Sequence, residues 1–203
     1  MNKFVLEKAV EKTRFVLEKK QVKNIKAHVV IDLDVSGSTE SMYSNGLFQK
    51  AFQQVLPIGI LFDDNQEIDV FTFSDGSKLK HVQPNATSAN YENYIIKNIL
   101  NSKDVPKWGG TTYRPVLEAN IATFNFERDV ETVKKKFFGL FNTTTVTKKL
   151  HTDSESGYPV IVFFFTDGEN ADVVDTYNYL KYCEENNLNI YFQFIGIDNG
   201  GFE

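Results

Sequence analysis

Cysteine and histidine are scarce in this chain, and their scarcity excludes two kinds of site. The single cysteine, Cys183, cannot form an internal disulfide, and its place in a helical pattern is typical of a small buried side chain. The three histidines, His28, His81 and His151, lie far apart and lack the spacing of zinc ligands. The sequence also contains no nucleophile elbow and no phosphate-binding P-loop.

Long apolar runs, a leader segment and a surplus of basic residues are missing too. No apolar run approaches the about 20 residues that cross a membrane, and residues 1–20 alternate charged with apolar side chains, unlike a secretory signal. The chain carries 27 acidic against 22 basic residues, which argues against a general nucleic-acid binder. We expect a cytoplasmic protein that engages neither nucleic acid nor membrane.

The most informative stretch that is present is Asp34-Val35-Ser36-Gly37-Ser38. It follows residues 27–33, an apolar run that predicts a buried strand. An acid and two hydroxyls at alternate positions after a strand present three oxygen ligands to one point. Hard divalent cations, Mg²⁺ above all, bind oxygen and keep several waters.

Two distant stretches could supply further oxygen ligands to the same cation. Gly109-Gly110-Thr111-Thr112 adds hydroxyls, and residues 163–168, Phe-Phe-Phe-Thr-Asp-Gly, form a second apolar strand that ends in an acid, Asp167. Strands separated by helices indicate an α/β fold with a mainly parallel sheet. Ligands of such sheets bind beyond the carboxyl ends of the strands, where the topology switches direction. If the two apolar strands are neighbours, Asp34 and Asp167 face one another.

The remaining elements follow from periodicity and turn residues. Pro57 and Gly59 weaken the end of one helix, and the segment after the lysine-rich helix is polar and aperiodic, which predicts an exposed loop. The expected elements are helices at 3–20, 47–60, 88–101, 116–124, 127–140 and 171–186, strands at 27–33, 67–73, 78–82 (a short antiparallel edge strand), 159–165 and 189–196, and a loop at 142–158.

The three oxygen-bearing stretches together resemble the metal-ion-dependent adhesion site of von Willebrand factor A (vWA) domains, which have Asp-x-Ser-Gly-Ser, then Gly-Gly-Thr, then Thr-Asp-Gly. Other stretches are similar to the vWA-like domain at the C-terminus of TerF-type tellurium-resistance proteins of bacteria and phages. These are Val16-Leu17-Glu18-Lys19-Lys20, Leu61-Phe62-Asp63-Asp64-Asn65, Gly110-Thr111-Thr112-Tyr113-Arg114-Pro115-Val116 and Tyr191-Phe192-Gln193-Phe194-Ile195-Gly196.

The resemblance implies a Rossmann-like, doubly wound sheet with helices on both faces. It divides the chain into an N-terminal amphipathic helix at 1–21 and a vWA-like domain at 22–203, with the 142–158 loop as an insertion. The family usually continues with another strand and a C-terminal helix. Because this chain stops at Glu203, we expect a domain that lacks them and an exposed sheet edge through which an oligomer could form.

The resemblance also implies a role for each ligand-type residue. Ser36 and Ser38 would bind the metal directly, and Thr111 directly or through water. Asp34 and Asp167 would hold metal-bound waters. The metal would be Mg²⁺, with Ca²⁺ or Mn²⁺ as alternatives, and most family members are recognition modules rather than enzymes. We therefore expect a protein that engages an Asp or Glu of a partner protein, in a tellurium- or stress-resistance system.

Three further residues bear on this site. Thr112 is disfavoured as a ligand, since the family's threonine follows the glycines immediately. Thr39-Glu40 stand where the family often has methionine, and Glu40 is expected to cap the next helix rather than to touch the site.

A rival hypothesis comes from the same first strand. Residues 30–35, Val-Ile-Asp-Leu-Asp-Val, also resemble the Asp-x-Asp start of haloacid-dehalogenase-type phosphatases. On that hypothesis Asp32 is the nucleophile, Asp34 the general acid and base, Mg²⁺ the cofactor, and Thr166 the phosphate-binding hydroxyl. It leaves Ser36, Ser38 and the Gly-Gly-Thr stretch unexplained.

Overall fold

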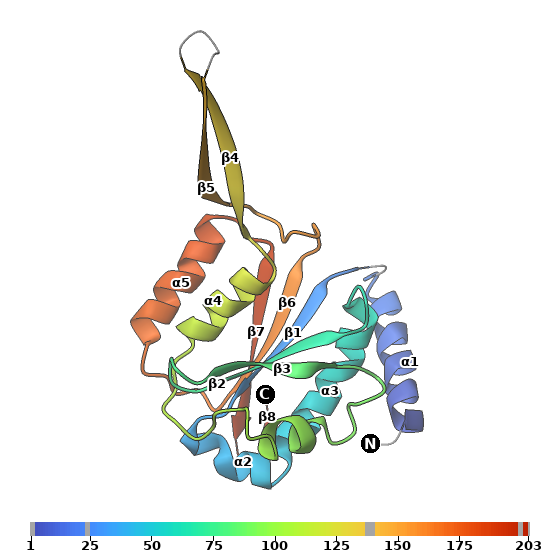
Figure 1. The fold of residues 1–203 in the computed structure, drawn as a ribbon. Helices are drawn as coiled ribbons and strands as arrows, with labels where there is room; N and C mark the ends of the chain where they lie inside the picture. Colours follow the sequence, from blue (N-terminus) through green and yellow to red (C-terminus); the bar gives the residue numbers. More distant parts are fainter. Residues whose placement is uncertain (1–2, 23–24, 137–140, 199–200, 203) are drawn as a thin grey trace.

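Parallel strands β2, β1, β6 and β7 form the centre of the sheet that positions the rest of the fold (Figure 1). The computed structural model of the chain describes every residue except 1–2, 23–24, 137–140, 199–200 and 203. Across the sheet the order is β3-β2-β1-β6-β7-β8. The strands are β1 (His28–Asp34), β2 (Ile68–Phe73), β3 (Leu79–Ala86), β6 (Val160–Thr166), β7 (Ile190–Asp198) and β8 (Gly201–Phe202).

Strands β3 and β8 run antiparallel to their neighbours at the two edges of the sheet. The predicted α/β fold, with a mainly parallel sheet and an antiparallel edge strand, is therefore confirmed. The chain leaves β1 toward β2 on one side and leaves β6 toward β7 on the other side. The boundary between β1 and β6 is thus the point at which the topology reverses, and ligands of such sheets bind beyond it.

Helices cover both faces of this sheet (Figure 1). On one face α3 (Leu47–Phe62) packs against alternate residues of β1, such as Ile31, and α1 (Lys3–Lys19) contributes Leu6 to the same core. On the other face α4 (Arg114–Thr123) and α5 (Val173–Glu185) pack over Val30 and Phe164. Buried apolar side chains on both faces explain why β1 and β6 are apolar runs without alternation.

Helix α3 continues past the two residues expected to weaken it. Pro57 lies inside the helix and Gly59 is buried. A Cβ atom at Gly59 would lie 3.1 Å from Cγ1 of Ile68 and 3.4 Å from Cγ1 of Val29. The glycine therefore lets α3 approach the sheet closely, and packing outweighs its poor helix propensity.

The helix predicted for residues 88–101 is largely wrong. Only residues 94–100 are helical, and most of them form the short π-helical segment η2 (Ile96–Leu100). Asn93 has a φ of 112°, which interrupts a helix. The side chains of Tyr91 and Tyr94 are nevertheless buried, and the Gln49 side chain accepts a hydrogen bond from Ile95 N at 3.1 Å. Tertiary contacts hold this segment instead of a helical ladder.

The predictions for residues 127–140 and 142–158 are also wrong. Strands β4 (Glu127–Lys136) and β5 (Phe141–Leu150) form an antiparallel hairpin of ten residue pairs that projects from one end of the body (Figure 1). The loop prediction fails for residues 142–150, and residues 137–140 of the predicted helix lie outside the described part. The run Thr143–Thr147, rich in β-branched residues, favours a strand. The described strands are thus 127–136 and 141–150, and the loop prediction holds for residues 151–158, which contain neither helix nor strand.

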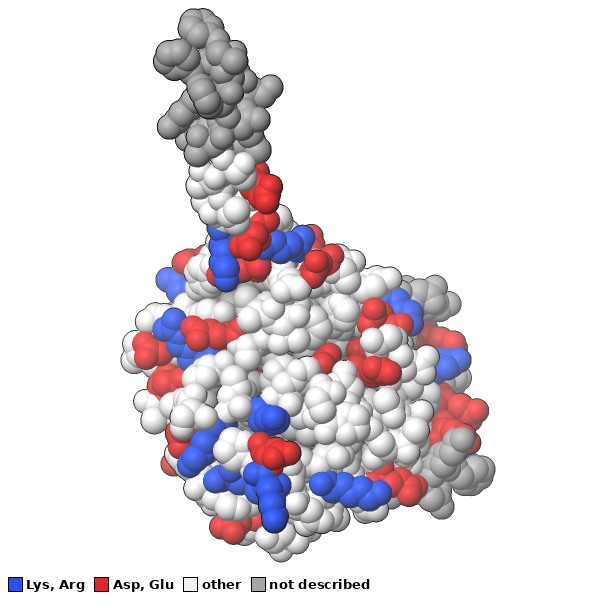
Figure 2. All heavy atoms as spheres, viewed as in Figure 1, with Lys and Arg blue, Asp and Glu red and all other residues white. Residues whose placement is uncertain are grey.

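The outer edge of β7 is largely uncovered among the described residues, because β8 pairs only with Ile197 and Asp198. Tyr191 is 61% exposed and Phe194 38% exposed on this strand. Figure 2 shows basic and acidic side chains interspersed over one face of the body. No helix within the described ranges combines the length and hydropathy needed to cross a membrane.

Candidate metal site at the carboxyl edge of the sheet

The two apolar strands that end in acids are neighbours. Leu33 of β1 pairs with Phe165 of β6 in parallel register. Both strands therefore end at the same edge, and Thr166 Oγ1 donates a hydrogen bond to Asp34 Oδ2 at 2.8 Å. The adjacency that the sequence could only suggest is present, and it lies at the topological switch point.

Asp34 is fully buried, and both of its carboxylate oxygens are engaged. Oδ1 accepts a hydrogen bond from Ser36 N at 2.8 Å, and Oδ2 accepts the bond from Thr166. Burial, together with the charge of the nearby Asp167 carboxylate, raises the pKa of Asp34 to about 6 despite these hydrogen bonds. The two carboxylates thus lie within reach of each other's charge.

The loop after β1 turns two serine hydroxyls toward each other. Ser36 Oγ and Ser38 Oγ are 3.1 Å apart. Thr39 fixes the turn, because its hydroxyl donates to the carbonyl of Ser36 at 2.8 Å and lies 3.2 Å from that of Asp34. Glu40 is the exposed first residue of α2 (Glu40–Ser44), and the N-cap position predicted for it is occupied by Thr39 instead.

The glycine loop is bound to the serine loop by its backbone. Gly37 N donates to Gly109 O at 2.9 Å, and Ser36 and Gly109 form a parallel β-bridge. Ser74, at the end of β2, holds the other side: its hydroxyl donates to Gly110 O at 2.7 Å. A Cβ at Gly109 would lie 2.6 Å from Lys78 Nζ and 2.9 Å from Ser74 Oγ. This position therefore requires glycine for close approach.

The two threonines of the glycine loop differ. Thr112 is tied to β2, since both its N–H and its hydroxyl bond to Ser74 O, at 2.8 and 3.3 Å. The hydroxyl of Thr111 makes no hydrogen bond within the described residues, while its carbonyl accepts one from Ala171 N at 2.8 Å. Thr111 is thus placed beside the segment that follows Asp167, with a hydroxyl available to a ligand.

Asp167 carries a buried oxygen, Oδ1, that has no hydrogen-bond partner. Next to it, Tyr113 Oη and Thr166 Oγ1 are 2.6 Å apart. Because Thr166 donates to Asp34, the phenol donates to Thr166, and a chain of hydrogen bonds runs from Tyr113 to Asp34. Burial, together with the charges of Asp34 and Asp167, raises the pKa of Tyr113 to about 12.

Asp172 fixes the start of α4 relative to the loop after β6. Its two oxygens accept hydrogen bonds from the backbone N–H groups of Tyr113 and Arg114, each at 2.9 Å. Burial raises the pKa of Asp172, but these hydrogen bonds outweigh it and the net shift is downward. The carboxylate caps a helix from a distant segment and thereby sets the position of Tyr113.

Within the described residues, no three His, Cys, Asp or Glu side chains gather where they could share a metal ion. The oxygens that could hold a cation at this edge are instead hydroxyls and carboxylates from separate loops. The hydroxyls of Ser36 and Ser38 are in direct contact. The carboxylates of Asp34 and Asp167 are close enough for their charges to interact. Thr111 is brought to the edge through the bond between its loop and Ala171.

The phosphatase hypothesis is not supported. Asp32 is completely buried beneath α4, and Asn120 Nδ2 donates to its Oδ2 at 2.7 Å. Burial raises its pKa well above the ordinary value. A nucleophile must reach its substrate, and a carboxyl group enclosed in the core cannot.

The fold and this edge define a vWA-type α/β domain. The chain belongs to the vWA-TerF-like family, described as the vWA found in the TerF C terminus, whose family model matches residues 26–203. It is 27% identical over 191 residues to the uncharacterized protein YcbR of Bacillus subtilis (strain 168), covering 94% of this chain and 65% of that protein.

Among solved structures, the chain is similar to proximal thread matrix protein 1 from the mussel byssus. The TM-score is 0.50 at 17% identity, over 87% of this chain and 39% of that one. This likeness supports the fold alone. The chain thus spans about two-thirds of the curated relative and less than half of the mussel protein.

Sequence reasoning missed four residues that shape this edge: Ser74, Tyr113, Thr166 and Asp172. Ser74 directly follows the predicted strand at 67–73, and its place at the end of a strand of the same parallel sheet was the available signal. Thr166 was considered only for the phosphatase hypothesis. Its place before Asp167 on an apolar strand was the available signal.

Proposed function

We propose that this domain is a metal-dependent protein-recognition module that binds Mg²⁺ at the edge formed by Asp34, Ser36, Ser38, Thr111 and Asp167. The observation that carries the proposal is the buried, unpartnered Oδ1 of Asp167. A buried carboxylate oxygen without a partner is costly, and a cation would satisfy it. The paired hydroxyls of Ser36 and Ser38 supply neutral oxygens of the kind that a hard cation accepts.

The hydrogen bonds suggest a different role for each residue. Both oxygens of Asp34 are occupied by protein donors, so Asp34 would orient the site and offset charge rather than bind the ion directly. Ser36, Ser38 and Thr111 would bind the ion or its waters. When bound, the cation would supply a positive centre with an open position for an incoming oxygen ligand.

An Asp or Glu side chain of a partner protein is the occupant that we propose for that position. The inner ligands are neutral hydroxyls, so the cation would retain much of its charge for a carboxylate. Ca²⁺ or Mn²⁺ could replace Mg²⁺ at such an oxygen site. Membership of the vWA-TerF-like family supports a role in tellurium or stress resistance as the setting for this recognition.

The test is calorimetric titration of the metal-free chain with Mg²⁺ and Mn²⁺. We expect saturable binding that is abolished in a Ser36→Ala/Ser38→Ala double variant and weakened about 10–100-fold in Asp34→Asn, the range for residues that orient ligands. Ser44→Ala is the matched control, because this exposed serine donates only to Glu40 O. Absence of binding, or equal binding by the double variant, would refute the proposal.

The partner claim has a separate test. An acetylated peptide that carries one Asp should bind the Mg²⁺-loaded chain and not the chain in EDTA, and its Asn counterpart should not bind in either condition. Binding that is unchanged by EDTA would place the peptide elsewhere on the surface.

A further inference from the structure

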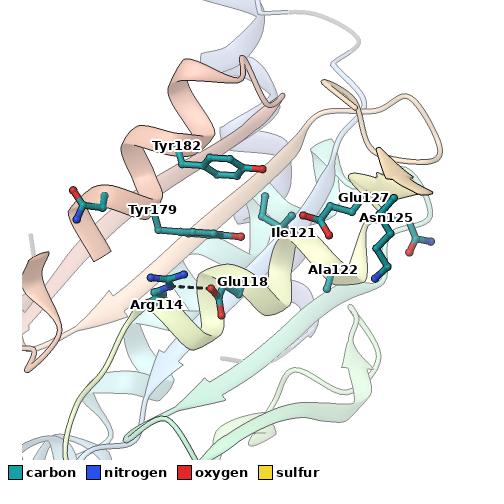
Figure 3. A pocket seen from close by; sticks show the side chains of 10 residues that line it. Arg114, Glu118, Ile121, Ala122, Asn125, Glu127, Tyr179 and Tyr182 are labelled. Carbon is teal, nitrogen blue, oxygen red and sulfur yellow. Dashed lines mark hydrogen bonds and ion pairs between the residues drawn. The ribbon is translucent and has the colours of Figure 1, made fainter. Parts of the chain in front are cut away.

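A small cavity lies at the amino-terminal end of the sheet, opposite the candidate metal edge. Its volume is about 320 Å³, and three segments of the chain supply its lining residues: His28, Thr123, Phe124, Asn125, Glu155 and Ser156. Asn125 also lines the larger groove between α4 and α5 (Figure 3). The fold thus brings a serine and a histidine to one cavity from positions that are 128 residues apart.

The loop that carries Ser156 is tied to the body through its backbone. Glu155 N donates a hydrogen bond to Phe124 O at 3.0 Å, at the end of α4. His28 N donates to Pro159 O at 2.8 Å, which joins the end of the loop to the start of β1. Ser156 itself is exposed. A fixed but accessible hydroxyl group can therefore meet a molecule from solvent.

The hydroxyl of Ser156 lies 2.6 Å from Nε2 of His28. Ser156 Oγ accepts a hydrogen bond from Tyr158 N at 3.2 Å, and its own proton has two possible acceptors. Of these, His28 Nε2 is nearer than Ser154 Oγ, which lies 3.1 Å away and donates to Tyr158 O. Ser156 therefore donates to the imidazole. A hydroxyl that donates to a histidine is an activated nucleophile.

The other ring nitrogen of His28 faces a carboxylate. Its Nδ1 lies 3.4 Å from Oδ1 of Asp64, a buried oxygen that has no hydrogen-bond partner in the described part of the chain. This neighbour favours a proton on Nδ1, which leaves Nε2 to accept the serine proton. Once His28 holds that proton, the imidazolium lies beside an unsatisfied carboxylate oxygen. The carboxylate thus stabilises the protonated state more than the resting state.

Aromatic rings hold the imidazole of His28 in place. The ring of Phe124 stacks on it, with centroids 4.8 Å apart and planes at 26°, and the ring of Tyr158 packs at 74° to it. The backbone N–H of Ser156 donates to no group among the described residues. One donor therefore remains beside the hydroxyl for a carbonyl oxygen that becomes negative.

We propose that Ser156 and His28 form a catalytic site for the hydrolysis of small esters, with Asp64 as a positioning residue. Ser156 Oγ bonds to the ester carbonyl carbon while its proton passes to His28 Nε2. The bond to the alcohol then breaks, and the alcohol leaves with that proton. Water attacks the acyl-serine, the same nitrogen carries the proton from water to the serine oxygen, and the acid is released.

The cavity limits the substrate of this site. A volume of about 320 Å³ is at the small end for a ligand pocket, so the acyl group must be short. The carboxylate of Glu155 in the wall disfavours anionic esters by charge repulsion. Small neutral or cationic esters are therefore the expected class. The reaction uses none of the candidate metal residues.

The test is hydrolysis of p-nitrophenyl acetate by the full chain in EDTA, combined with labelling by diisopropyl fluorophosphate. In the labelling reaction the serine oxygen binds phosphorus and fluoride leaves. We expect turnover of the ester and one label per chain, which mass spectrometry of the digested protein places on Ser156. Ser156→Ala should abolish the label and the turnover.

Two variants and a matched control separate catalysis from folding. His28→Gln should slow labelling about 100-fold or more, as expected for loss of a general base. Asp64→Asn should slow it about tenfold and shift the half-maximal pH of labelling downward, because the imidazolium loses a stabilising charge. His81→Gln is the control: His81 also stacks on a phenylalanine and bonds to Asp69, but contacts no serine hydroxyl among the described residues.

Four outcomes would overturn the proposal: no turnover, a label on residues other than Ser156, an unchanged labelling rate in His28→Gln, or an equal loss of rate in His81→Gln. Amide spectra of the variants report whether each one is folded. Because EDTA is present throughout, these outcomes are separate from any failure of the metal proposal.

Discussion

The candidate metal edge and the β4–β5 hairpin are stabilised in opposite ways. At the edge, Thr166 bonds to Asp34 across 132 positions of sequence, and Gly37 bonds to Gly109 of another distant loop. In the hairpin, all ten residue pairs lie between Glu127 and Leu150. The edge is a product of the whole fold, whereas the hairpin depends on its own ladder, which is marginally stable by itself.

This difference suggests that the two regions have different roles. A metal site needs ligands held in place before the ion arrives, and long-range hydrogen bonds within a packed core provide that rigidity. The hairpin projects from the opposite end of the body, after α4 and before β6 (Figure 1). Among the described residues of the hairpin, Glu127 and Lys148 at its base line the groove between α4 and α5.

The largest effect should follow from a core substitution beneath the edge. Phe164 is fully buried, and its ring lies 4.7 to 4.9 Å from those of Phe73, Tyr113 and Phe194. Phe164→Ala should lower the free energy of unfolding by about 3–5 kcal/mol, because it leaves a cavity. Urea denaturation measures this, and metal affinity should fall as Tyr113 loses its support. A loss of less than about 1 kcal/mol in the free energy of unfolding would mean that the packing of Phe164 beneath the edge does not support the edge.

A smaller effect, confined to the edge, should follow from Thr166→Val. This change keeps the shape and removes the hydroxyl between Tyr113 and Asp34, so a buried oxygen of Asp34 loses its donor. We expect a loss of about 1–3 kcal/mol in stability and a loss of about tenfold or more in Mg²⁺ affinity, measured by denaturation and calorimetry.

The matched control for Thr166→Val is Thr72→Val on the neighbouring strand β2. Thr72 is also fully buried, but its hydroxyl has no hydrogen-bond partner. Its replacement should be neutral or stabilising and should leave Mg²⁺ affinity unchanged. If Thr166→Val and Thr72→Val lost the same stability and the same Mg²⁺ affinity, the hydrogen-bond chain from Tyr113 to Asp34 would contribute nothing specific to the edge.

The sequence predicted those residues of the edge that directly follow an apolar strand. Asp34 and Asp167 could be found because each follows an apolar run, and apolar runs identify buried strands. Ser74 and Tyr113 could not be assigned in the same way. Their roles depend on which strands are neighbours and on how Asp172 fixes the start of α4, and neither is encoded locally.

The hairpin was missed for a related physical reason. Val130 and Val133 are three residues apart, which is a helical spacing, and only cross-strand pairing, such as that of Val130 with Thr147, makes this segment a strand. The π-helical segment η2 is a similar case, since the bond from Ile95 N to Gln49 replaces a helical one. Cross-strand and tertiary partners are invisible to local patterns.

The smallest effect is expected in the hairpin itself. Val146 is 55% exposed and lies opposite Glu131, so Val146→Ala should change the free energy of unfolding of the body by less than about 0.5 kcal/mol. Amide hydrogen exchange should be much faster in the hairpin than in β1, because its ladder can open without unfolding the sheet. Exchange of the hairpin amides at the rate of those in β1 would show that hairpin and body unfold together. The metal edge and the hairpin would then differ in their position in the fold but not in their local stability.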